Sequence, residues 1–158
     1  MGQRAETIAR DFEAAVADLT TEIEGCSDAK WKATTEEGWS VGTLAQHVAG
    51  QFPLEMEFLT AAAEGRPLPG YSWDDVNQKN DTRAAKEANV TKDEVLRTLR
   101  DGSASVAKWL RSLDDSQLDR KGALGLANGA EVTTEQLIQG GVLIDHARGH
   151  LKSIQAAG

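Results

Sequence analysis

Hydrophobic side chains recur at helical spacing in four long stretches of this chain. In residues 5–24, apolar positions fall three and four residues apart with charged residues between them, as in a helix that buries one face. The same spacing returns in residues 40–65, 91–113 and 133–154. The pattern therefore predicts four long helices and an all-α fold.

Polar residues at the starts of these stretches fit helix caps. Ser40 precedes the second stretch as an N-cap. Thr91 and Glu94 have the spacing of a capping box, in which each side chain accepts a hydrogen bond from the other residue's backbone amide. Thr133 and Gln136 repeat this spacing before the last stretch. We expect the helices to begin at these residues.

Proline and glycine mark the irregular parts of the second stretch. Pro53 lies inside it and cannot donate a backbone hydrogen bond to Ala49, so we expect a kink just past His47. Residues 65–70 then combine two prolines and two glycines, which ends the helix.

The connections between the long helices differ in length. Residues 71–89 are polar but have helical spacing after a cap at Ser72, so we predict a shorter helix in a crossover between the second and third long helices. Residues 121–132 are rich in glycine and fit either a loop or a small hairpin. Residues 1–158 are thus predicted to form a single domain, a four-helix bundle with a long crossover connection.

Composition narrows the choice of partners. The chain has 158 residues, 40% of them hydrophobic, and a formal net charge of −8. This length suits one core, and an acidic surface repels nucleic acid and anionic lipid headgroups. We therefore expect a small-molecule substrate, with no nucleic-acid or membrane partner.

Two further features bear on the compartment. Cys26 is the only cysteine, so the chain cannot form an internal disulfide. The sequence lacks an apolar N-terminal run of signal-peptide length and any apolar stretch of about 20 residues that would cross a bilayer. A cytoplasmic protein is the expectation.

All three histidines of the chain lie at the border of helical apolar stripes. His146 and His150 are four residues apart and project from one helix face, while His47 lies about a hundred residues earlier. If the two helices pack side by side, three neutral imidazoles can hold one divalent ion and leave a coordination position open, as in catalytic zinc sites. The alternative is that each histidine is a core residue with its own hydrogen-bond partner.

Helical spacing suggests two more residues for such a site. Gln51 follows His47 by one turn on the same face, where its amide could bind a ligand histidine, a water or a substrate. Asn77, in the crossover stretch, is a neutral amide that can be buried near an ion without an unpaired charge. We predict Gln51 and Asn77 as substrate-binding residues, although a solvated polar face explains Asn77 equally well.

Two motifs also resemble a known family. The run from Gly38 to His47, with Trp39 and the Ser40 cap ahead of the histidine-bearing helix, resembles the second helix of DinB-like proteins. The run from Asp145 to Ile154 is similar to their last helix. The superfamily includes mycothiol-dependent maleylpyruvate isomerases and bacillithiol transferases.

This resemblance implies a DinB-like four-helix bundle with long crossovers, often a homodimer. It also implies a metal held by side chains at positions that match His47, His146 and His150. Imidazole ligands favour zinc or nickel over magnesium. The expected function is that of a metal-dependent enzyme, a thiol-dependent S-transferase or isomerase that uses a low-molecular-weight thiol cosubstrate and acts on a small electrophile. A metal-dependent hydrolase and a non-catalytic small-molecule or metal-binding module are the alternatives.

Overall fold

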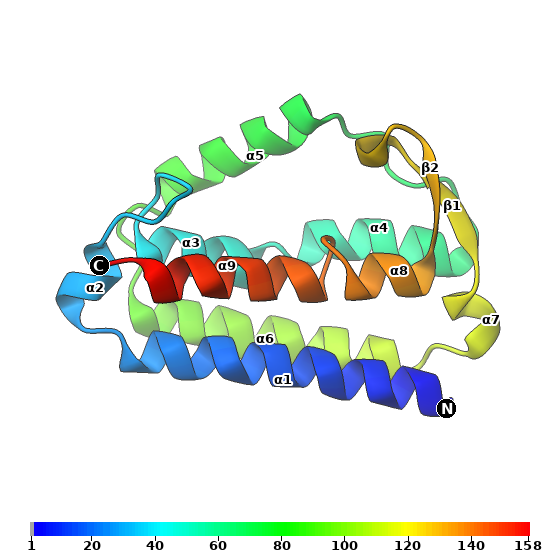
Figure 1. Cartoon of the computed structure of the whole chain (residues 1–158), viewed down its shortest axis with the longest axis horizontal. Coiled ribbons are helices and arrows are strands. Elements are labelled where there is room, and N and C mark those ends of the chain that lie inside the picture. Colours follow the sequence, from blue (N-terminus) through cyan, green and yellow to red (C-terminus); the bar gives the residue numbers. More distant parts are fainter. Residues whose placement is uncertain (1) are drawn as a thin grey trace.

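The four helical stretches pack together as a bundle in the computed structural model, which describes residues 2–158 (Figure 1). The helices, in chain order, are α1 (Gln3–Gly25), α2 (Asp28–Lys32), α3 (Val41–Gly50), α4 (Phe52–Glu64), α5 (Trp73–Lys86), α6 (Lys92–Arg111), α7 (Asp115–Leu118), η1 (Gly125–Ala127, a 3-10 turn), α8 (Thr134–Gln139) and α9 (Ile144–Ala156). Helix α1 packs against α6 and α9, and α3 packs against the same two helices. The all-α prediction is confirmed.

The core consists of the apolar faces that the spacing predicts. Its largest fully buried side chains are Phe12, Leu19, Ile23, Leu44, Leu59, Leu99, Leu110, Leu118, Ile138, Leu143, Ile144 and Ile154. Each such side chain contributes about 1.5–3 kcal/mol by leaving water. They come from every helix of the bundle, so the driving force for folding is spread along its length.

The predicted second helix is two helices. Helix α3 ends at Gly50 and α4 begins at Phe52, with Gln51 as the cap between them. Pro53 occupies the first turn of α4, where its missing amide hydrogen is tolerated. The expected kink is therefore a full break one turn past His47.

The predicted fourth helix is also divided, which the apolar spacing did not reveal. Helix α8 ends at Gln139 and α9 begins at Ile144. Gly140, at the end of α8, has extended backbone angles and its carbonyl accepts from the amide of Asp145. Gly140 and Gly141 stabilise a helix poorly, and this explains why the chain leaves the helix there. The prediction of one continuous helix over residues 133–154 was therefore wrong at these two glycines.

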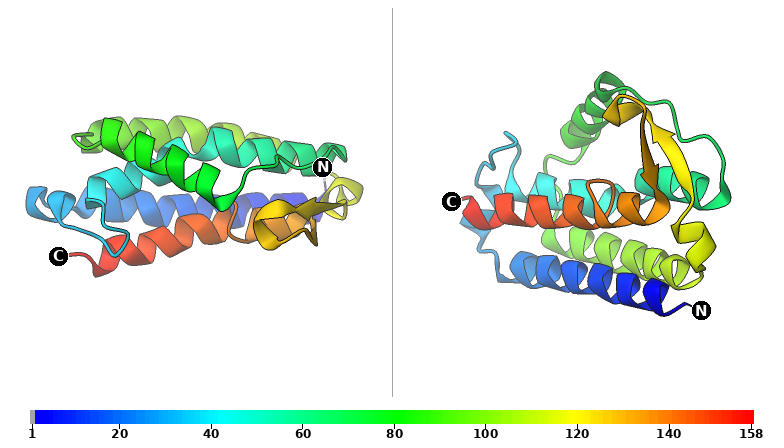
Figure 2. Two further views of the ribbon diagram at one scale, coloured as in Figure 1. Left: turned by 90° about the horizontal axis from the view of Figure 1, so that it is seen from above. Right: turned by 45° about the vertical axis from the view of Figure 1, so that its right-hand side comes forward.

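The connections form an arch over one side of the bundle (Figure 2). Helix α5 is the predicted crossover helix. For residues 121–132 the sequence allowed a loop or a hairpin, and the structure has a hairpin, in which β1 (Lys121–Leu124) is antiparallel to β2 (Ala130–Thr133). Asn128 and Gly129 turn the chain with positive φ angles of 56° and 77°. The Trp73 indole donates to the Leu126 carbonyl over 2.9 Å, which joins α5 to the hairpin.

The helix starts agree with the predicted caps. Ser40 and Ser72 accept backbone hydrogen bonds at the starts of α3 and α5. Thr91 and Thr133 begin α6 and α8, each within a complete capping box. No helix in the described part of the chain, residues 2–158, is long and apolar enough to span a bilayer.

Candidate metal centre

The three histidines come together where α3 packs against α9. His47 projects from α3, and His146 and His150 project from α9. Nε2 of His146 lies 3.1 Å from Nε2 of His47 and 3.1 Å from Nε2 of His150. The predicted side-by-side packing of the two helices is therefore present, and the imidazole nitrogens converge on one point.

Two carboxylates lie behind two of the imidazoles. The His150 Nδ1–H donates to Glu37 Oε1 over 3.0 Å, and His146 Nδ1 lies 2.9 Å from Glu55 Oε1, although its N–H is not well aligned with that oxygen. His47 Nδ1 is buried and has no partner among the described residues. The carboxylates favour the tautomer with hydrogen on Nδ1, so the Nε2 lone pairs of His146 and His150 face the common point.

Facing lone pairs make the site suitable for a cation. Neutral nitrogens 3.1 Å apart repel one another unless a proton or a metal ion lies between them. The separation is also close to that of two imidazoles each about 2.0–2.1 Å from one zinc ion. The donor set and its spacing fit a divalent ion better than three separate core histidines, because the three rings share one point.

Burial keeps the His47 and His150 imidazoles neutral. It is the main cause that lowers the pKa of His47 to about 3, followed by the charges of His146, His150 and Arg83. Burial and then His146 likewise lower the pKa of His150, against the opposing effect of Glu37. Metal binding requires neutral imidazole, so His47 and His150 are in their binding form at neutral pH.

Sequence reasoning missed both carboxylates. Glu55 is 5% exposed, and burial raises its pKa against the opposing effect of His146. The sequence contained a signal for the burial of Glu55, because this acidic residue shares a helix face with Phe52, Phe58 and Leu59, which are buried. Glu37 lies in a loop, where no periodic pattern marks it. Burial pushes its pKa up, but its hydrogen bonds, including that with His150, lower it overall.

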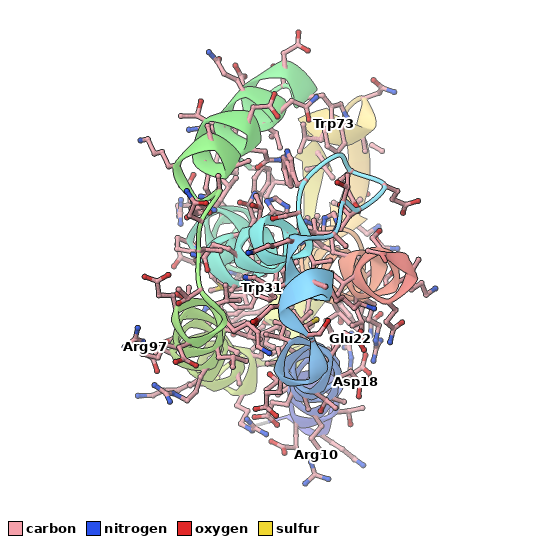
Figure 3. All side chains as sticks on the ribbon, turned by 90° about the vertical axis from the view of Figure 1, so that its left-hand side faces the viewer. Arg10, Asp18, Glu22, Trp31, Trp73 and Arg97 are labelled. Atoms are coloured by element: carbon pink, nitrogen blue, oxygen red, sulfur yellow. The ribbon has the colours of Figure 1, made fainter. Side chains whose placement is uncertain are left out.

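The histidines line a pocket of about 320 Å³ between the bundle and the arch. Its apolar wall consists of Trp39, Leu54, Phe58, Trp73, Val76, Leu126 and Val142. Trp73 is 59% exposed and lies beside the hairpin, where α5 passes over the bundle (Figure 3). The polar groups in this apolar pocket are therefore concentrated around the histidines, as is typical of small-molecule sites.

The two predicted substrate-binding residues have different positions. Gln51 is buried and lines the histidine pocket, and its Oε1 accepts from Arg83 over 2.9 Å. Asn77 is exposed on α5 and is not part of the pocket wall. Asn80, one turn later, lines the pocket instead. A binding role for Gln51 and Asn77 stays a prediction, and Asn77 lies outside the pocket that would carry it.

Comparison with known proteins gives a family-level match. The family model described as the DinB superfamily matches residues 11–154. No curated protein matches the sequence.

Several solved structures share the fold at low sequence identity. YfiT from Bacillus subtilis, described as a probable metal-dependent hydrolase with an unusual four-helix bundle topology, is 17% identical with a TM-score of 0.76, over 98% of this chain and 86% of YfiT. A mycothiol-dependent maleylpyruvate isomerase is 15% identical with a TM-score of 0.73, over 98% of this chain and 60% of the isomerase. The colibactin self-resistance protein ClbS, solved in complex with a dsDNA, is 14% identical with a TM-score of 0.68, over 96% of this chain and 95% of ClbS. At these identities the likeness concerns the fold alone.

Proposed function

The chain belongs to the DinB superfamily, and on that premise we propose that it is a metal-dependent enzyme that adds a low-molecular-weight thiol to a small electrophilic molecule. One observation carries the proposal. The three Nε2 atoms of His47, His146 and His150 converge at the wall of an apolar pocket. A metal site that opens on such a pocket can bring a nucleophile to an apolar substrate.

The chain's own residues supply the binding and orientation. His47, His146 and His150 would hold one divalent ion, with zinc or nickel the best match for imidazole ligands. Glu55 and Glu37 fix the ring orientation of His146 and His150 from behind. When bound, the ion supplies a positive charge that lowers the pKa of a thiol or water at its open position.

The pocket then selects the second reactant. Its volume of about 320 Å³ is at the lower end of the range for ligand pockets and suits one small molecule. Trp39, Phe58 and Trp73 give it aromatic walls against which an apolar part of a substrate can pack. The thiol loses its proton to solvent, and its sulfur forms a bond to the electrophilic carbon. In S-transfer the bond from this carbon to the leaving group breaks, and the leaving group takes the electron pair. In isomerisation the carbon–sulfur bond breaks again, and the expelled thiolate recovers a proton.

Hydrolysis is the second candidate. An open position between three imidazoles accepts water as readily as a thiol. The description of YfiT as a probable metal-dependent hydrolase supports this alternative at the level of the family. A module that binds a small molecule without turnover is the non-catalytic alternative.

Cobalt-substituted protein separates the candidates. Addition of a small thiol is expected to produce a sulfur-to-cobalt charge-transfer band, and a panel of thiols with electrophiles is expected to give multiple turnovers. An unchanged cobalt spectrum at saturating thiol would rule out thiol activation. Turnover of esters or amides without thiol would then support hydrolysis, and stoichiometric binding without turnover would support the non-catalytic module.

A further inference from the structure

A second, more polar cavity adjoins the histidine pocket. This groove, of about 850 Å³, lies between α4 and α5. It shares Gln51, Leu54 and Asn80 with the histidine pocket, so the two cavities are neighbours. None of the three histidines lines the groove, and its chemistry differs from that of the histidine pocket because basic and acidic side chains from α5 line much of it.

Arg83 is the arginine of the groove, and only one side of its guanidinium is hydrogen-bonded within the described residues. Its Nη1 donates to the Gly50 carbonyl over 2.8 Å and to Gln51 Oε1 over 2.9 Å. Both N–H groups of Nη1 are thereby used, and the N–H groups of Nε and Nη2 have no acceptor within the part of the chain that the structure describes. That free edge has the geometry with which a guanidinium binds a carboxylate through two hydrogen bonds.

The guanidinium of Arg83 has no carboxylate at ion-pair distance among the described residues. Arg83 is half-buried, and it forms no ion pair within 4.0 Å with the acidic side chains of residues 2–158. Of the three acids in the groove, Asp75 accepts from the Ser72 amide, Glu57 accepts from the Tyr71 hydroxyl, and Glu87 accepts from the Gln46 amide. All three carboxylates thus have other partners and do not pair with Arg83.

Arg83 is also fixed in place by what it does contact. Gly50 and Gln51 form the break between α3 and α4, immediately after the turn that carries His47. Because arginine only donates, the Gln51 atom that it contacts is the oxygen, and the amide nitrogen is left to donate elsewhere. A guanidinium held in this way loses little conformational freedom when it binds an anion.

We propose that the groove is a binding site for the carboxylate of a substrate, with Arg83 as its anchor. The substrate would place its carboxylate on the free edge of Arg83 and extend past Gln51 and Leu54 into the histidine pocket. Lys86, three residues after Arg83 and also lining the groove, adds positive charge at the same end. The assignment of the reactive end to the histidine pocket rests on the proposed function, whereas carboxylate binding by Arg83 does not.

Either reactant of the proposed reaction can bring the carboxylate, and matched probes distinguish the two. N-acetylcysteine and N-acetylcysteamine share a thiol but differ in the carboxylate. 3-Phenylpropionate and 3-phenylpropanamide share an apolar end and differ in charge. Binding is measured by titration calorimetry, first in the presence of a metal chelator and then with zinc-loaded protein.

In chelator, at least one carboxylate probe is expected to bind about tenfold or more tightly than its neutral partner, and the Arg83→Gln variant should abolish that difference. Preference for N-acetylcysteine assigns the carboxylate to the thiol, and preference for 3-phenylpropionate assigns it to the electrophile. Arg97→Gln removes the same charge from an exposed position on α6, away from α5 (Figure 3), and should leave the difference unchanged. Circular dichroism checks that both variants are folded.

Equal affinities within both pairs for the wild-type protein would overturn the proposal, as would an equal loss in Arg83→Gln and Arg97→Gln. If Arg83→Gln fails to fold, Lys86→Gln replaces it, and no change in the carboxylate preference of that variant would also count against the site. Because these measurements are made in chelator, they stand apart from the proposed function. Carboxylate binding without metal-dependent turnover would refute only the enzyme, and turnover without carboxylate preference would refute only the groove.

Discussion

At the level of single residues, the carboxylates behind the histidines determine which ring nitrogens face the pocket. Glu55 reaches His146 from α4, and Glu37 reaches His150 from the loop before α3. A histidine oriented in this way already presents Nε2 to the common point, so its ring does not have to rotate before an ion binds. The candidate metal site is therefore a product of five side chains from four segments of the chain, rather than of three histidines alone.

Glu55→Gln tests this contribution. Glutamine keeps the size of the side chain but removes the charge that orients His146, so zinc affinity is expected to fall about 10–100-fold. Competition with a chromogenic chelator measures the change. Glu64→Gln, an exposed substitution on the same helix, is the matched control and should retain wild-type affinity. Equal affinities in both variants would show that Glu55 does not support the site.

The pH dependence of stability tests the burial of His47. In metal-free protein the folded state keeps His47 neutral down to its pKa of about 3, whereas the unfolded chain protonates it below about 6.5. The contribution of His47 to the free energy of unfolding is therefore fully present above pH 6.5. It falls by about 1.4 kcal/mol per pH unit as the pH drops from 6.5 toward 3.

Urea unfolding in chelator between pH 7.5 and 4.5 measures this slope. The variant His47→Gln has no titrating group at this position and should show a shallower decline. A decline of the same steepness in the variant would mean that His47 is not the group responsible.

The sequence allowed prediction of the histidines but not of their supporting residues. His146 and His150 are recognisable because four-residue spacing on a helix fixes their relation, and His47 follows as the only other histidine. Glu37 could not be predicted, because a loop residue has no periodicity to relate it to a distant helix. The sequence left two positions open for Asn77, a pocket or a solvated face, because the polar pattern of this helix does not distinguish its faces; the structure places Asn77 on the exposed face.

At the level of elements, helix breaks rather than helix lengths shape the site. The break at Gln51 separates α3, which carries His47, from α4, which carries Glu55. The break at Gly140 and Gly141 places Val142 in the pocket wall before α9 begins. Apolar periodicity predicted where the helices lie, but it continues across both breaks. The sequence analysis therefore predicted an irregularity only at the first break, from its proline.

Packing at the first break is tested by Gly102→Ala. A Cβ at this position of α6 would lie 2.8 Å from Cδ2 of Phe52, the first residue of α4. Alanine normally stabilises a helix relative to glycine, but overpacking costs about 1–3 kcal/mol, so a net loss of stability is expected.

Gly149→Ala is the control for intrinsic helix preference. Its Cβ would meet no atom within 4 Å, so this variant should gain up to about 1 kcal/mol. Urea unfolding measures both variants. A gain of similar size at Gly102 would contradict the close contact between α6 and Phe52.

At the level of the whole molecule, the core and the metal site have separate tasks. The fully buried apolar side chains come from all parts of the bundle, whereas the histidines lie at the pocket on one side. Loss of a metal ion would remove a local constraint but not the burial that drives folding, unlike the case of a zinc finger. Far-ultraviolet circular dichroism is expected to remain helical after treatment with a chelator.

The metal content of the purified protein tests the central claim most directly. Elemental analysis after dialysis against zinc is expected to give one ion per chain for the wild type and a sharp loss for His47→Ala, His146→Ala and His150→Ala, with helical circular dichroism retained in each. Wild-type content in all three folded variants would contradict the account, because the ion would then lie elsewhere.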